Sequence, residues 1–380
     1  MFRKVTDSRA CRARISNDSL GIRECAAHGR FAAVRSSFLR IRYAAFAAFF
    51  VFLSVMKTMI DIFGALGREL ADFGRTPATE AVIRRAVKEN AWFQPQEIVG
   101  AVEAIRSEML DRARLEAWAG DCVPARRRKE VLVIMAGNIP LVGFFDLLCV
   151  LMSGHACRIK PSGKDRVLME YVVGRLLDIE PGLPLGAARP ATRPDAVIAT
   201  GSGNANRCFR SLYSGVPALL RGNRQSAAVL AGDESDAELR GLEEDIFSYS
   251  GLGCRSVSLL FLPRGCMPAL RCTATNPKYR HDYLRQRALL RMRRLPYVDL
   301  EGAVLYEERS FPAALSRLHY TFYDTPDEVE EWLAAHDDEL QCVVSRCVRH
   351  SRLAAFGAAQ HPGLTDYADG RDTMRFLAAI

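Results

Sequence analysis

The fold of this 380-residue chain is indicated by an apolar run, Val131-Leu-Val-Ile-Met135. After Ala136 it is followed by Gly137-Asn-Ile-Pro140. A continuous apolar run that ends in turn-forming residues is typical of a buried parallel strand. Residues 141–153 follow as an apolar helix. The same order of strand, turn and helix recurs over residues 156–177 and 196–213. Three such units predict an α/β fold with a doubly wound parallel sheet.

A polar residue lies at or just after the end of each of these three strands. Asn138, Lys160 and Thr200 each follow a predicted strand. In a parallel sheet the carboxyl ends of the strands share the edge at which ligands bind. Two other interpretations stay open, because Asn138 is also suited to cap the next helix, and Lys160 could be a solvated residue at the end of a strand.

Further elements on both sides of this sheet predict two domains. The helices expected before it cover residues 60–73, 78–89 and 95–118. After it we expect strands over residues 227–231, 257–262 and 340–345, and helices over residues 282–294 and 326–335. Thr325 is placed to cap the last helix. The expected organisation is an extension (1–55), a first domain with a helical lead-in (56–225) and a second domain (226–380).

Cys254 lies between a helix and an apolar strand, in Phe247-Ser-Tyr-Ser-Gly-Leu-Gly-Cys-Arg255. Glycines at 251 and 253 allow positive φ and a close approach of the backbone to a bound molecule. A thiol there can reach a carbonyl carbon while neighbouring N–H groups point at its oxygen. A nucleophilic thiol should have a pKa below the free value of about 8.5. The alternative is a small buried cysteine that only packs.

The net charge of +8 is concentrated at one end of the chain. Residues 1–42 hold nine Arg and one Lys against three acidic residues, a net charge of +7. The rest is close to neutral and lacks a basic stripe with interleaved aromatic residues, which argues against nucleic acid as a partner. The eleven Cys form no Cys-x-x-Cys pair and the seven His are scattered. We therefore expect reduced thiols, a cytoplasmic location and no metal site.

Residues 43–56 form an apolar run interrupted only by Ser54. The run is short for a membrane span, which needs about 20 residues, and no good signal-peptide cleavage site follows it. A start of synthesis at Met56 or Met59, where an amphipathic helix begins, is the third interpretation. We favour it and expect residues 1–55 to be poorly ordered or artefactual, with a membrane anchor as the alternative.

Three motifs together resemble the aldehyde dehydrogenase superfamily, in particular its acyl-CoA reductase branch, typified by the fatty-acid reductase of bacterial luminescence. They are Ala136-Gly-Asn-Ile-Pro140, Phe247 to Arg255, and Gln360-His-Pro-Gly-Leu-Thr-Asp-Tyr-Ala-Asp-Gly370. The resemblance covers the chain from about residue 57 onward. It implies an NAD(P)-binding domain followed by an α/β catalytic domain. Cys254 matches the family nucleophile, and Asn138 the amide that forms the oxyanion hole with the N–H of the nucleophile. The last motif receives no chemistry from the resemblance, and we expect it to serve docking or subunit contact.

The resemblance also implies where a dinucleotide binds. Lys160 matches a lysine that contacts the adenosine ribose, with Ser162 and Lys164 beside it. Thr200, Gly201 and Ser202 match a turn against the pyrophosphate and nicotinamide. NAD-preferring relatives often carry a glutamate where this chain has Gly163. A missing carboxylate and an adjacent lysine favour NADPH, with NADH possible.

One departure from the family bears on the reaction. Dehydrogenases that release a free acid carry a glutamate base before a Gly-Gly-Lys turn, and the corresponding residues 219–225 (LLRGNRQ) contain no carboxylate. The departure favours reduction of an acyl-CoA thioester, or an acyl-protein, to an aldehyde. The alternatives are an aldehyde-oxidising dehydrogenase and a non-catalytic acyl-carrying scaffold of an acyl ligase or transferase. The resemblance further implies a homo-oligomer and a possible acyl ligase or transferase as partner.

Overall fold

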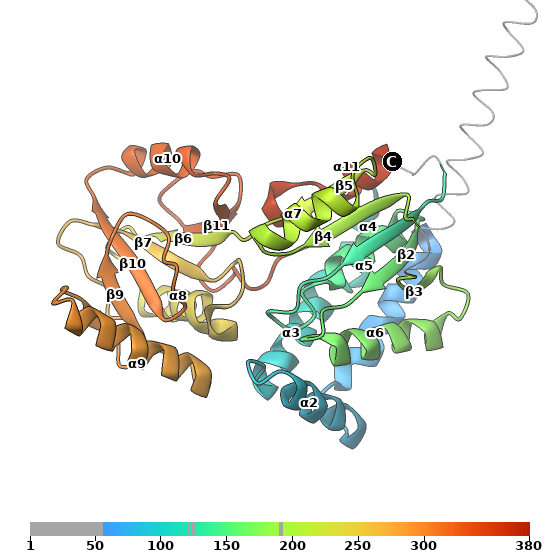
Figure 1. Ribbon diagram of the computed structural model, residues 1–380, viewed down its shortest axis with the longest axis horizontal. Helices are drawn as coiled ribbons and strands as arrows, with labels where there is room; N and C mark the ends of the chain where they lie inside the picture. The colour runs from blue at the N-terminus through green and yellow to red at the C-terminus, as the bar shows by residue number, and fades with distance from the viewer. Residues whose placement is uncertain (1–55, 121, 123–126, 190–192) are drawn as a thin grey trace, which may run out of the picture. The chain divides into compact units, whose positions relative to one another are not determined.

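The structure is a computed structural model that describes residues 56–120, 122, 127–189 and 193–380 (Figure 1). All of these residues belong to one compact unit of the chain. The apolar run 43–55 and the expected disorder of residues 1–55 lie outside the described residues. Within the described ranges, no helix is long and apolar enough to cross a membrane.

The apolar run that begins at Val131 lies in the central strand of a five-stranded, all-parallel sheet. The strand order is β3-β2-β1-β4-β5. The strands are β1 (Glu130–Ile134), β2 (Ala156–Lys160), β3 (Leu185–Ala187), β4 (Ala196–Thr200) and β5 (Ala218–Arg221). Three helices connect them, namely α5 (Phe144–Met152), α6 (Arg166–Ile179) and α7 (Gly203–Leu212).

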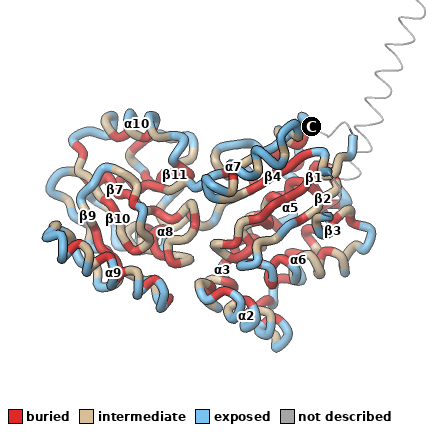
Figure 2. The backbone as a smooth tube through the Cα atoms, in the orientation of Figure 1, coloured by how far each residue is buried: buried red, intermediate tan, exposed pale blue. Residues whose placement is uncertain are grey.

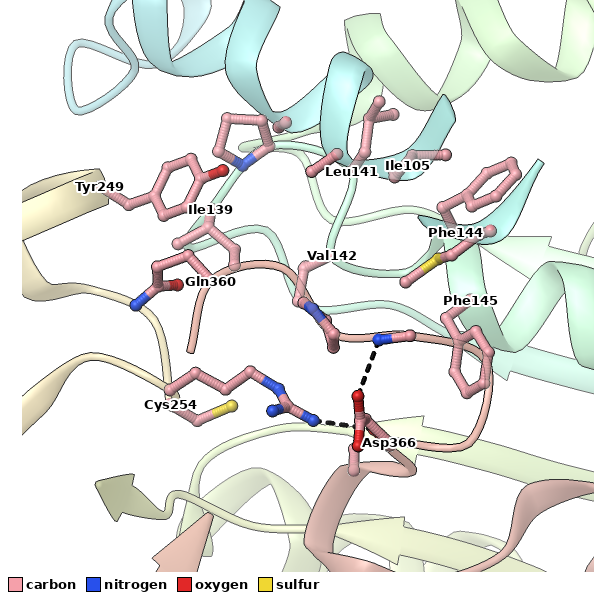
Figure 3. A pocket seen from close by; sticks show the side chains of 18 of the residues that line it. Ile105, Ile139, Leu141, Val142, Phe144, Phe145, Tyr249, Cys254, Gln360 and Asp366 are labelled. Atoms are coloured by element: carbon pink, nitrogen blue, oxygen red, sulfur yellow. Dashed lines mark hydrogen bonds between the residues drawn. The ribbon is translucent and has the colours of Figure 1, made fainter. Parts of the chain in front are cut away.

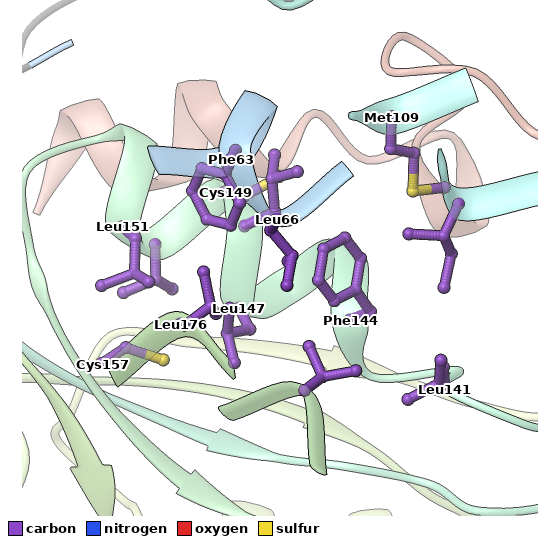
Figure 4. Packing of buried hydrophobic residues seen from close by; sticks show 14 of the residues in the cluster. Phe63, Leu66, Met109, Leu141, Phe144, Leu147, Cys149, Leu151, Cys157 and Leu176 are labelled. Atoms are coloured by element: carbon purple, nitrogen blue, oxygen red, sulfur yellow. The ribbon is translucent and has the colours of Figure 1, made fainter. Parts of the chain in front are cut away.

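Helices cover both faces of this sheet, which is why β1 is apolar from Val131 to Ile134. Val131 and Val133 pack into a large cluster with α5, α6 and the helix over residues 56–69 (Figure 4). Leu132 and Ile134 face the other way and pack against Phe209 and its neighbours on and after α7. Successive side chains of a strand point to opposite faces, so a strand buried on both sides cannot alternate apolar with polar residues. The expected doubly wound parallel sheet is confirmed.

Three further helices precede β1 and pack around that cluster. They are α2 (Pro77–Glu89), α3 (Pro95–Met109) and α4 (Arg112–Gly120). Figure 2 shows the strands of the first sheet as largely buried and the outer side of α2 as exposed. The expected single helix over residues 95–118 is wrong, because the Asp111 carboxylate accepts a hydrogen bond from the Arg114 N–H and starts a new helix.

A second sheet of seven strands follows, in the order β12-β11-β6-β7-β10-β9-β8. All its pairs are parallel except β8 with β9. Its strands are β6 (Gln225–Val229), β7 (Val257–Pro263), β8 (Val298–Asp299), β9 (Val304–Glu307), β10 (Arg317–Tyr323), β11 (Leu340–Ser345) and β12 (Leu353–Ala354). Its helices are α8 (Asp236–Phe247), α9 (Pro277–Met292) and α10 (Pro326–Ala335). The expected strand 340–345 and helix 326–335 are confirmed, including the Thr325 cap, whose side chain accepts from the Glu328 N–H.

The chain passes from the first sheet to the second between Arg221 and Gln225, and its C-terminal segment returns to the first sheet. This segment contains the short helices η3 (Ala368–Gly370) and α11 (Thr373–Ala379). Asp369 pairs with Arg224 at 3.4 Å. Near α11, the Thr373 hydroxyl accepts a hydrogen bond from Arg221 at 2.7 Å. Arg221 at the end of β5 and Arg224 just before β6 thus both contact the C-terminal segment.

We predict that Asp146→Ala lowers the free energy of unfolding by about 3–5 kcal/mol, because it leaves a buried guanidinium unpaired. Arg221 donates to both Asp146 oxygens, at 2.6 and 2.5 Å, and its side chain is 4% exposed. The matched control is Asp324→Ala, which breaks the exposed pair with Arg264 and should leave the free energy of unfolding nearly unchanged. Urea denaturation measures both, and equal losses would contradict the structural role of Arg221.

Candidate active site

Cys254 is presented by a strained loop, residues 248–256, called here the cysteine loop. Tyr249, Ser250 and Gly251 have φ of 54°, 53° and 68°, three left-handed residues in a row. This conformation costs of order 1–3 kcal/mol at each residue other than glycine, and it persists only when the surroundings hold it. Ser250 is buried. The loop reverses the chain between α8 and β7 and sets Cys254 three residues before the strand.

Neighbouring elements hold the cysteine loop at several points. The Ser226 hydroxyl, at the start of β6, donates to the Cys254 carbonyl at 3.0 Å. The N–H groups of Tyr249 and Ser250 hydrogen bond to the Glu97 carboxyl in the first turn of α3. Burial nevertheless raises the pKa of Glu97 to about 7, because desolvation outweighs these hydrogen bonds. A half-buried carboxyl therefore lies against the strained residues of the loop.

Asn138 joins the first sheet to the cysteine loop. Its side-chain amide donates a hydrogen bond to the Leu252 carbonyl, two residues before Cys254. The alternative role as a helix cap is wrong, because α5 begins only at Phe144 and Gly143 occupies the cap position. The expected helix start at Leu141 is wrong for a related reason. Leu141 is left-handed, with φ of 55°, and its N–H donates to the Asp165 carboxyl at 2.9 Å.

An apolar pocket of about 160 Å³ adjoins Cys254. Figure 3 shows Tyr249 and Cys254 at one end and Phe144 and Phe145 at the other. Most of the remaining apolar wall comes from α3 and from the loop after β1, namely Ala101, Ala104, Ile105, Met109, Ile139, Pro140, Leu141 and Val142. Pro362 and Ala368 of the C-terminal segment complete it. Such a pocket fits a hydrocarbon chain or an aromatic ring far better than a polar group.

The polar side of the pocket belongs largely to the C-terminal segment. Gln360, Gly363 and Asp366 line it, together with Arg255 and Gln341. Arg255 donates to the Asp366 carbonyl, and the Gly363 N–H donates to the Asp366 carboxylate, both at 2.8 Å (Figure 3). The sequence interpretation missed this role and gave the motif from Gln360 to Gly370 only docking or subunit contact. The motif completes the wall of the pocket that contains Cys254.

The expectation of a lowered thiol pKa is wrong for this conformation. Burial raises the pKa of Cys254 to about 11, and the Arg255 guanidinium lowers it only in part. The Asp369 carboxylate adds to the rise. The thiol is therefore protonated at neutral pH, and nucleophilic attack requires removal of its proton.

The six residues expected to bind a dinucleotide lie at the carboxyl ends of β2 and β4. Lys160 is the exposed last residue of β2, and Thr200 is the last of β4. Both strands flank β1, where Ile134 pairs with Lys160 and with Ala199. The structure thus brings these two residues to one edge of the sheet, as the sequence predicts.

The turns beyond these strands fit a phosphate-bearing ligand. Ser202 caps α7, and a Cβ at Gly203 would meet no atom within 4 Å. The free N–H groups at such a helix start attract phosphate. On the other turn, Ser162 accepts from the Lys164 N–H at 3.3 Å. A Cβ at Gly163 would also point into open space.

The segment that would carry a water-activating glutamate carries Arg221 in a structural role instead. Arg221 is held in the buried pair with Asp146 and points its charge toward α5. Among the described residues, Asp366 is the one carboxylate in the wall of the apolar pocket, and it already accepts from the Gly363 N–H. Residues 219–225 contain no carboxylate, so none of them can activate water beside Cys254.

The structure is similar to solved aldehyde dehydrogenases. Aldehyde dehydrogenase 21 from Physcomitrella patens, in complex with the reaction product succinate, has a TM-score of 0.54 and 11% identity, covering 77% of this chain and 72% of that one. An NAD-dependent benzaldehyde dehydrogenase from Corynebacterium glutamicum has 0.54 and 13%, covering 80% of each chain.

A propionaldehyde dehydrogenase from the fucose utilisation microcompartment of Clostridium phytofermentans has a TM-score of 0.52 and 12% identity, covering 81% of each chain. No protein-family model matches the sequence, and no curated protein matches it. The chain has the α/β fold of the aldehyde dehydrogenases, as the sequence motifs predicted.

Proposed function

We propose that this protein is an NADPH-dependent acyl-CoA reductase that converts a thioester into an aldehyde through an acyl group on Cys254. The observation that carries the proposal is an apolar pocket that ends at Cys254 and receives no carboxylate from residues 219–225. An acyl chain fits such a pocket, and an acyl-cysteine without a base to activate water is long-lived. The coarser assignment, an NAD(P)-dependent oxidoreductase of aldehydes, rests on the fold and on the same cysteine.

The residues act in the following order. The Cys254 thiol releases its proton to solvent and its sulfur attacks the thioester carbonyl carbon, so that a new carbon–sulfur bond forms and the bond to CoA breaks. CoA leaves as a thiolate and takes up a proton. When bound, the nicotinamide supplies the hydride for reduction. Addition of that hydride and a proton gives a thiohemiacetal on Cys254, which releases the aldehyde and the free thiol.

Asn138 is the proposed side-chain donor to the carbonyl oxygen as it becomes negative. Its amide nitrogen carries two hydrogens, and one of them is held by the Leu252 carbonyl. The second is available to the substrate, together with the N–H of Cys254. The bond to Leu252 fixes the amide in place before substrate binds, which is how an oxyanion donor is preorganised.

Six residues would hold the dinucleotide, namely Lys160, Ser162, Lys164, Thr200, Gly201 and Ser202. Their task is to bind and orient it, with the start of α7 toward the phosphates. Open space at Gly163 and the cation of Lys164 favour NADPH, and NADH is the alternative. We further propose that the protein is a cytoplasmic homo-oligomer that receives its acyl group from a ligase or transferase.

An aldehyde-oxidising dehydrogenase is the rival within the same fold. It needs a base to activate water beside the acyl-cysteine. Asp366 is the candidate in the described pocket, but its carboxylate is engaged by the Gly363 N–H. An acyl-carrying scaffold, the rival of another class, would need neither the oxyanion donor nor the dinucleotide edge.

We predict that Cys254→Ala abolishes acyl-CoA-dependent oxidation of NADPH, because no covalent intermediate can form. NADPH binding, followed by its fluorescence, should survive, since the proposed dinucleotide site lies on the first sheet. Acyl-CoAs of graded length are the substrates, and Cys266→Ala, a partly exposed cysteine outside the apolar pocket, is the control. Clear residual activity in Cys254→Ala would show that another group is the nucleophile.

We predict that alkylation of Cys254 by iodoacetamide accelerates about tenfold per pH unit between pH 7 and 10, since only the thiolate reacts. Its pKa is raised to about 11, so the thiolate fraction grows throughout this range. Peptide mass spectrometry can follow Cys254 beside the exposed Cys208 as an internal reference. A rate that levels off below pH 8 would mean that the thiol is already activated without substrate.

A further inference from the structure

Gln341 lies at an irregularity in β11. The register of β11 against β6 shifts between Leu340 and Val343, so Gln341 and Cys342 form a bulge. Bulges are frequent next to active sites, where they redirect a side chain. This bulge is adjacent to the cysteine loop, because Ser226 contacts both the Cys342 backbone N–H, at 3.2 Å, and the Cys254 carbonyl, at 3.0 Å.

The Gln341 side chain has an unused hydrogen-bond donor. The residue is 1% exposed, and its Nε2 has no hydrogen-bond partner. Its Oε1 accepts from the Asp369 N–H at 3.1 Å. That bond fixes the orientation of the amide, because a flipped Gln341 would set its NH2 group against another donor. A buried donor left unpaired is costly, so its presence points to a ligand.

Gln341 belongs to the walls of two pockets. It lines the apolar pocket at Cys254 and also a second pocket of about 420 Å³. Arg255 and Asp366 are shared in the same way. The other polar residues of the second pocket are Ser351, Arg352, His361, Thr365, Tyr367 and Asp372. The apolar pocket at Cys254 and the polar pocket therefore share three wall residues, and Gln341 with its unpaired Nε2 is one of them.

A thioester substrate has the same two parts. Its acyl chain is apolar, and the carrier arm on the other side of the sulfur bears amide groups whose carbonyl oxygens accept hydrogen bonds. With the reacting carbon at Cys254 and the chain in the apolar pocket, the arm must leave by another route. A polar pocket with an unpaired amide donor matches an amide-bearing arm.

We propose that the second pocket binds the carrier arm of the thioester and that Gln341 Nε2 donates a hydrogen bond to a carbonyl oxygen of that arm. This assignment rests on the proposed acyl-CoA reductase function and adds its substrate-binding residue. None of the six described dinucleotide residues, from Lys160 to Ser202, lines either pocket. The arm and the dinucleotide thus approach Cys254 by separate routes.

The test compares Gln341→Leu, which keeps a similar size and removes the donor, with the matched control Gln286→Leu. Gln286 is also buried, at 2% exposure, but lies on α9 outside both pockets. Two reactions are measured. One is steady-state reduction of acyl-CoA, and the other is the single-turnover burst of NADPH from an aldehyde and NADP without CoA. The aldehyde has the acyl chain but no arm.

Gln341→Leu should raise KM for acyl-CoA about tenfold or more and leave the aldehyde burst unchanged, while Gln286→Leu changes neither. Free CoA should inhibit reduction without competing with NADPH. An unchanged KM, an equal loss in both reactions, or competition between CoA and NADPH would overturn the assignment. A wild-type protein that gives an aldehyde burst but reduces no acyl-CoA would overturn the proposed function itself, and the arm site with it.

Discussion

The hydrogen bond from Asn138 to the Leu252 carbonyl joins the two halves of the site. Asn138 belongs to the loop after β1, at the ligand-binding edge of the first sheet, whereas Leu252 lies in the loop that presents Cys254. The cysteine loop is strained at Tyr249 and Ser250 and cannot define its own position. Contacts from Asn138, Ser226 and Glu97 hold it from three different elements. The chemistry we propose needs that rigidity, because oxyanion donors act only when their positions are fixed in advance.

The central features of the fold could be predicted from local patterns. The apolar run at β1 and its repeats specify a sheet buried on both faces, and Thr325 with Pro326 marks the start of α10. Short edge strands such as β3 and β8 carry too few residues for a periodic signal. The break between α3 and α4 was missed, although Asp111 followed by a helical pattern is a recognisable cap.

The site was predictable only in part. Cys254, Asn138 and the residues after β2 and β4 carry sequence motifs, and the structure brings the first two together through Leu252. Gln341 carries no motif, because its role depends on a bulge in β11 and on Asp369, 28 residues away. The direction of the Cys254 pKa shift also depends on long-range burial. Desolvation of the thiol outweighs the adjacent Arg255 guanidinium, which lowers the pKa only in part.

We propose that the acyl group stays covalently bound to Cys254 until NADPH reduces it. The most direct measurement incubates the protein with acyl-CoA in the absence of NADPH, quantifies released CoA, and follows the intact protein by mass spectrometry. We expect release of one equivalent of CoA per active site and a stable acyl adduct on Cys254. When NADPH is added, the acyl group should leave as aldehyde. Continuous release of free fatty acid without cofactor, at a rate near that of reduction, would contradict it, because a base such as Asp366 would then be activating water.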